Sequence, residues 1–150
     1  MRRRAACGVV LGGLALPAFA TDYESPVQVL DAIDDLEAEV EARLSSLAGR
    51  VAGVEPLRRS IAAAHARHRV ERDRLRARRG LPPGRPPGDQ GREGTLADLR
   101  DAAERLVYAH AEGIGVLDTD AVAVVASHLV TLSGHLTVID LWIDQGNPRG

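Results

Sequence analysis

The chain has a single cysteine, Cys7, and no lysine at all. One cysteine rules out a disulfide framework and a Cys-x-x-Cys-His attachment site for haem. There is also no Gly-rich phosphate-binding loop, and no serine or cysteine nucleophile beside a recognisable base. All 19 basic residues are arginine, which we interpret as a codon bias and not as a functional choice. These absences leave histidines and carboxylates as the groups that could carry chemistry.

The first twenty residues have the composition of a signal peptide. Arg2 to Arg4 precede an apolar run from Ala5 to Leu16, and Ala18-Phe19-Ala20 gives a small-residue cleavage pattern. The apolar run is shorter than the roughly 20 residues that span a bilayer, and we expect no spanning segment later in the chain. The arginine pairs fit twin-arginine export, and general secretion fits equally well. The sequence therefore predicts an exported protein, periplasmic or secreted.

The charge balance of the mature chain is acidic. Removing the signal peptide with its three arginines leaves 16 basic and 21 acidic residues, a net charge of −5 with histidine neutral. This balance argues against nonspecific binding of nucleic acid. The remaining residues 21–150 are enough for one domain with a single core. A homodimer is left open, and nothing in the sequence requires one.

Apolar residues recur at steps of three and four in four stretches, which predicts an all-α four-helix bundle. The predicted helices cover about 26–50, 55–79, 95–117 and 119–145, with a Pro/Gly-rich linker at 80–94. Ser25, Thr95 with Asp98, and Asp118 or Thr119 are predicted to cap helix starts, and Gly80 to end the second helix. The fourth stripe is wholly apolar, so we expect that helix to be the most buried.

Ionisable residues take apolar places in three of these stripes. Glu37 interrupts the first, His68 and Glu71 the second, and His110 the third. A buried carboxylate or imidazole needs a partner, because burying a polar group without one costs several kcal/mol, roughly 2–7 by transfer measurements. The stripes therefore predict polar contacts inside the bundle.

Residues equally far from a turn lie at the same height in an antiparallel helix pair. A turn at Gly53 places Glu41 opposite His65 and Glu37 near His68, and a turn near Val116 places Glu104 opposite His128. Whether the linker crosses the bundle or returns directly, these residues and His110 share one layer, with His135 one or two turns further along. Imidazole with carboxylate predicts a transition metal, Fe, Mn, Zn or Cu, with Zn or Cu favoured by the histidines. The candidate ligands are Glu37, Glu41, His65, His68, Glu71, Glu104, His110, His128 and His135.

Simpler interpretations account for the same residues. A core histidine bonded to a carboxylate or a backbone carbonyl would produce the same pattern without a metal. Glu37 would be satisfied by a salt bridge to Arg72 or by a neighbouring histidine. The arginine run from Arg67 to Arg79 is typical of a solvated helix face, although it could also bind an anionic surface.

Two segments, HARHRVERDRLRARRG and SHLVTLSGHLTVIDLW, resemble the second and fourth helices of the ferritin-like superfamily. That resemblance implies a four-helix bundle with one glutamate from each of two helices and a Glu-x-x-His motif from each of the other two. By position, Glu37 or Glu41 would be the ligand from the first helix and Glu104 the ligand from the third. His68 and His135 would be the two motif histidines.

The motif glutamates are replaced in this chain, by His65 before His68 and by Leu132 before His135. Less negative charge is then available for two iron ions, which argues against a standard ferroxidase centre and for a mononuclear or histidine-rich site. Glu71 could supply a displaced carboxylate. The leading hypothesis is an exported ferritin-like protein that binds a transition metal through Glu and His side chains. The alternative is a noncatalytic structural or interaction protein with a degenerate site, and no reaction can be assigned.

Overall fold

The computed structural model describes residues 23–84 and 93–145, and in this part of the chain it has four helices and no strand. The helices are α1 (Pro26–Ala48), α2 (Val54–Arg79), α3 (Leu96–Gly113) and α4 (Thr119–Asp144). The prediction of an all-α chain with four helices is confirmed. The predicted signal peptide, residues 85–92 of the predicted linker and the last five residues lie outside the described residues.

The predicted helix caps are present. The Ser25 side chain accepts a hydrogen bond from the first turn of α1, and Asp118 does the same for α4. Thr95 and Asp98 form a reciprocal capping box at the start of α3. Gly80 ends α2 with a φ of 64°, a left-handed conformation that glycine adopts without steric cost.

Helix α3 ends four residues before its predicted end. The amides of Val116 and Leu117 both donate to the Gly113 carbonyl, at 3.0 and 3.2 Å, and close a turn there. Gly113 also lies directly against Val29 of α1, where a Cβ atom would collide with the valine side chain. The helix therefore ends in a turn at Gly113, and the missing side chain of this glycine allows α1 to come close.

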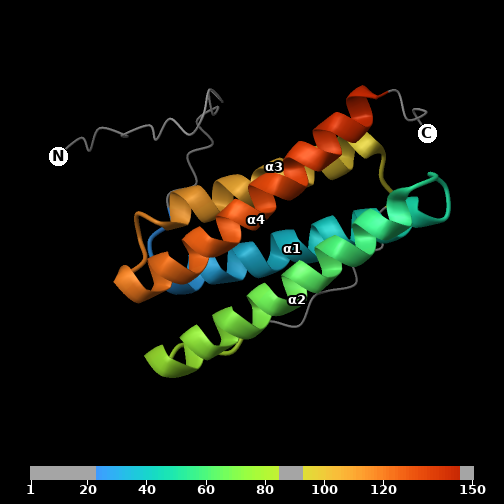
Figure 1. Ribbon diagram of the computed structural model, residues 1–150. Helices are drawn as coiled ribbons and strands as arrows, with labels where there is room; N and C mark the ends of the chain where they lie inside the picture. The colour runs from blue at the N-terminus through green and yellow to red at the C-terminus, as the bar shows by residue number, and fades with distance from the viewer. Residues whose placement is uncertain (1–22, 85–92, 146–150) are drawn as a thin grey trace.

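Each helix packs against two neighbours, in the ring order α1, α2, α4, α3, and neighbours run antiparallel (Figure 1). Helices α2 and α3 lie on opposite corners of the ring and run in the same direction. At one end of the bundle Arg79 of α2 pairs with Asp118 before α4, at 2.6 Å. At the other end Arg50, after α1, donates to the carbonyl of Gly94, before α3, at 2.8 Å. The end of α2 and the start of α3 therefore lie at opposite ends of the bundle.

Helix α4 is not the most buried, so that prediction was wrong. Six of its 26 residues are buried, against ten of 23 in α1 and nine of 18 in α3. The difference arises because α1 packs closely on both α2 and α3, whereas the outer side of α4 carries further apolar residues that no described residue covers. Val130 is 76% exposed and Leu141 is 53% exposed.

Helix α4 is also long and apolar enough, by length and composition alone, to cross a membrane. Our expectation that no later segment would meet this criterion was therefore wrong. A core helix of a bundle passes the same test, and 33% of the most apolar window of α4 is buried.

Candidate functional site

A buried arginine, Arg72 of α2, joins two acidic side chains of α1 in the interior. Arg72 donates two hydrogen bonds to the carboxylate of Glu37 and two to Oδ1 of Asp34. Arg76 donates to Oδ2 of Asp34 at 2.6 Å and lies 3.1 Å from Asp31. Two guanidinium groups thus neutralise the carboxylates that α1 places in the interior.

The charges in this cluster are stabilised mutually. Burial raises the pKa of Glu37, but hydrogen bonds from His68 and Arg72 outweigh it and lower the pKa to about 2. Burial lowers the pKa of Arg72, but Glu37 and Asp34 more than compensate and raise it above its ordinary value. At neutral pH, Glu37 and Arg72 therefore form a fully ionised buried pair.

Helical spacing explains why these arginines are buried. His68, Arg72 and Arg76 are four residues apart and share one face of α2, the face that packs on α1. Our interpretation of the arginine run as a solvated face was wrong for Arg72 and Arg76 and is confirmed for exposed members such as Arg67. The i, i+4 spacing from His68 is the signal that could have identified both arginines, and Asp34 lies one turn before Glu37 on the facing helix.

The two contacts predicted between α1 and α2 are confirmed. His65 Nδ1 lies 3.2 Å from Glu41 Oε1, and His68 Nδ1 lies 3.3 Å from Glu37 Oε1. Because a carboxylate can only accept, each Nδ1 is the protonated nitrogen and donates. The assumption that the chain turns near Gly53 was therefore sufficient to predict which glutamate contacts which histidine.

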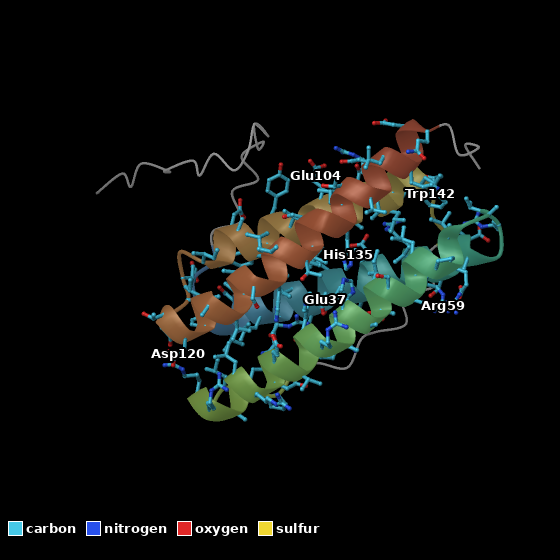
Figure 2. All side chains as sticks on the ribbon, in the orientation of Figure 1. Glu37, Arg59, Glu104, Asp120, His135 and Trp142 are labelled. Carbon is cyan, nitrogen blue, oxygen red and sulfur yellow. The ribbon has the colours of Figure 1, made fainter. Side chains whose placement is uncertain are left out.

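The predicted contact between Glu104 and His128 does not form. His128 Nε2 donates instead to Glu71 Oε2 of α2, at 2.7 Å. Glu104 accepts from Arg100 at 3.0 Å and lies on the far side of the α3–α4 pair from Glu37 (Figure 2). His128 points from α4 towards α2. Glu104 lies on the opposite side of the α3–α4 pair, where Arg100 bonds both Glu104 and Asp140.

Histidines from three helices gather next to the ion pair. The rings of His68 and His128 stack with centroids 3.9 Å apart, and the ring of His110 meets His128 edge-on at 6.1 Å. The ring centroid of His65 lies 6.2 Å from that of His68. The predicted layer is thus confirmed as an arrangement of side chains for Glu37, Glu41 and these four histidines. Glu71 joins it through His128, and Glu104 does not belong to it.

Three imidazoles have one nitrogen fixed as a donor and the other unpartnered. His65 donates through Nδ1 to Glu41, His110 through Nδ1 to the Leu106 carbonyl at 2.9 Å, and His128 through Nε2 to Glu71. Within the described residues, the opposite nitrogens of these rings are buried without a hydrogen-bond partner, as is Nδ1 of His135. In a neutral ring of this tautomer the unpartnered nitrogen carries a free lone pair.

The pKa values of three histidines favour the neutral ring. Burial lowers the pKa of His110 to about 3, only partly offset by the Leu106 carbonyl. Burial also lowers the pKa of His135 to about 4, and His65 and His68 lower it further. Burial lowers the pKa of His128 as well, although Glu71 opposes that shift. These imidazoles are unprotonated at neutral pH, the form in which imidazole binds metals.

No three His, Cys, Asp or Glu side chains within residues 23–84 and 93–145 are placed as a group that could hold a metal ion. The carboxylates among the predicted ligands are engaged by arginine or histidine instead. Comparison with known proteins adds no assignment, because no family model, curated protein or solved structure matches this chain.

Proposed function

We propose that this protein is exported and binds a transition metal ion inside a ferritin-like bundle, through histidine nitrogens. The observation that carries the proposal is the set of imidazoles, His65, His110 and His128, each anchored through one nitrogen and unpartnered at the other. Histidine ligands of metals have this arrangement, in which a carboxylate or carbonyl accepts from the distal nitrogen and orients the ring.

The donor set differs from the one that the ferritin-like resemblance implies. Glu37 is bonded to Arg72 and His68, Glu71 to His128, and Glu104 to Arg100. The donors that remain are neutral nitrogens, which favour Zn or Cu over the iron that carboxylate-rich sites hold. The helix directions support the ferritin-like bundle itself, because one long connection joining two hairpins is its defining topology.

A second candidate function is a noncatalytic structural or interaction protein that has lost its metal. The observation that favours it is Arg72, whose guanidinium lies between Glu37 and Asp34 with no exposure to solvent. An arginine in that position supplies the positive charge that a metal would otherwise give to the two carboxylates. The bundle would then need no ion to be stable.

Metal content and thermal stability separate the two candidates. The mature protein, purified without chelators, is analysed for metals, and its melting temperature is measured with added Fe, Mn, Zn and Cu salts. A ligand at about 100 times its Kd stabilises the folded state by about 2.7 kcal/mol, so a bound ion raises the melting temperature by several degrees. His65→Leu should reduce that increase. Metal-free protein whose melting temperature ignores all four ions would overturn the proposal in favour of the second candidate.

A further inference from the structure

Two of the unpartnered imidazoles line the same small cavity. His65 of α2 and His135 of α4 border a space of about 10 Å³, roughly the room that one water molecule requires. The other lining residues are aliphatic and come from all four helices. They are Val40, Ile61, Ala103, Leu106, Leu132 and Ile139.

The nitrogens without partners in these two rings are His65 Nε2 and His135 Nδ1. The His65 ring is held from behind, because its Nδ1 donates to Glu41 at 3.2 Å. The cavity is therefore lined by two imidazoles from neighbouring helices, each with an unpartnered nitrogen, and one ring is fixed in orientation by a carboxylate that does not line the cavity.

The composition of the cavity restricts which ion it suits. No carboxylate lines it, and two imidazoles are its only donors. Zinc and divalent iron require at least three protein ligands, and the cost of burying an ion grows with the square of its charge. Cu(I) satisfies both the number of ligands and the charge. This d¹⁰ ion is stable with two nitrogen donors in linear coordination, and it carries a single charge.

We propose that the His65–His135 cavity binds one Cu(I) ion between His65 Nε2 and His135 Nδ1. This inference rests on the proposed metal-binding function and names the ion and the two ligands. His110 and His128 do not line the cavity. The site is lined mostly by aliphatic side chains, and Arg72 is not among its lining residues.

The test is an anaerobic titration of the full mature chain with Cu(I), in competition with the chromophoric chelator bicinchoninate. The wild-type protein is expected to withdraw one equivalent of Cu(I) from the chelator. His135→Leu and His65→Leu should each weaken this binding at least tenfold. The matched control is Glu104→Gln, which changes a side chain that lies outside the histidine layer and bonds Arg100, and it should leave Cu(I) binding within about twofold. Circular dichroism confirms that each variant is folded.

Each other outcome has a separate meaning. Cu(I) binding that persists in His135→Leu and is lost in His110→Leu would overturn this site while supporting a metal elsewhere in the layer. Binding of Zn(II) without binding of Cu(I) would also overturn this inference and leave the proposed function standing. No binding of either ion would overturn both. If His65→Leu fails to fold, His135→Leu decides, because His135 is only half-buried and its Nδ1 has no partner to lose.

Discussion

Arg72 donates two hydrogen bonds to the carboxylate of Glu37 in the interior of the bundle, and neither side chain is exposed to solvent. Such a pair contributes little net stability when intact, because both charges have lost their hydration. Removing one partner is costly, however, since the other charge is then left buried alone. Because α1 and α2 each supply one partner, a shift between the two helices would leave a buried charge unpaired.

Replacing Arg72 alone should be strongly destabilising. We expect Arg72→Met to lower the free energy of unfolding by about 3–5 kcal/mol, because Glu37 and half of the Asp34 carboxylate lose their main partner. The double variant Arg72→Met with Glu37→Met should recover much of that loss, giving a coupling energy above about 1 kcal/mol. Urea unfolding followed by circular dichroism measures all four members of the cycle.

The control for this cycle is Arg74→Met, on the exposed side of the same helix. A change there should stay within about 0.5 kcal/mol, as is usual for surface positions. Equal effects of Arg72→Met and Arg74→Met would show that the buried pair has no special role in the packing of α1 on α2.

Two glycines in helices should respond to alanine in opposite directions. A Cβ at Gly113 would collide with Val29, so Gly113→Ala should cost about 1–3 kcal/mol through overpacking. A Cβ at Gly134 of α4 would meet nothing within 4 Å, so Gly134→Ala should stabilise by up to about 1 kcal/mol through helix propensity. Thermal or urea unfolding of the two variants tests this, and destabilisation by Gly134→Ala would show that α4 needs this glycine for another contact.

The sequence predicted the helices and the contacts within one hairpin, because both depend on local spacing. Periodicity located all four helices. The rule that residues equally far from a turn lie at the same height correctly paired Glu41 with His65 and Glu37 with His68. The rule failed for Glu104, because equal height says nothing about which side of a helix a residue faces. Rotation of α4 is decided by its packing against both α2 and α3, which the sequence of one hairpin does not contain.

The sequence offered a salt bridge from Arg72 as one way to satisfy Glu37, and that pair forms. That Arg72 and Arg76 are both buried was not predicted, for a related reason. In composition both belong to an arginine run that is mostly solvated, and only their spacing from His68 distinguishes them from their exposed neighbours. The arginines of the run lie on all sides of α2, so the side of the helix on which each one lies decides whether it is buried.

Gly84 packs against the same cluster, since a Cβ atom there would lie 2.8 Å from Asp34 Oδ2. Helical periodicity does not predict such a contact.

The capping box at the start of α3 should be worth a measurable part of the stability. Thr95 accepts from the Asp98 amide at 3.2 Å, and Asp98 accepts from the Thr95 amide at 2.8 Å. Thr95→Ala removes one of these bonds and should cost about 1 kcal/mol, whereas Thr95→Ser should cost much less. Urea unfolding measures both, and identical values for alanine and serine would mean that the hydroxyl does not cap the helix.

Acid should destabilise the metal-free protein through its buried histidines. The pKa of His110 falls from about 6.5 in the unfolded chain to about 3 in the folded protein, so the unfolded chain binds more protons between these values. The stability contributed by neutral His110 is therefore complete above pH 6.5 and is lost as the pH falls towards 3. His135 acts in the same direction down to about pH 4, and Glu37 adds a further loss between about pH 4.5 and 2.

For His110 alone, this linkage amounts to about 2 kcal/mol between pH 7 and pH 5. We expect His110→Leu to lose about that much less stability than the wild-type protein over the same interval, because leucine cannot take up the proton. Urea unfolding at both pH values in the presence of a chelator gives the two differences. Thr95→Ala serves as the control, since its destabilisation should be the same at pH 7 and pH 5. If His110→Leu and the wild-type protein lose equal stability on acidification, the pKa of His110 is the same in the folded and unfolded states, which would contradict this prediction.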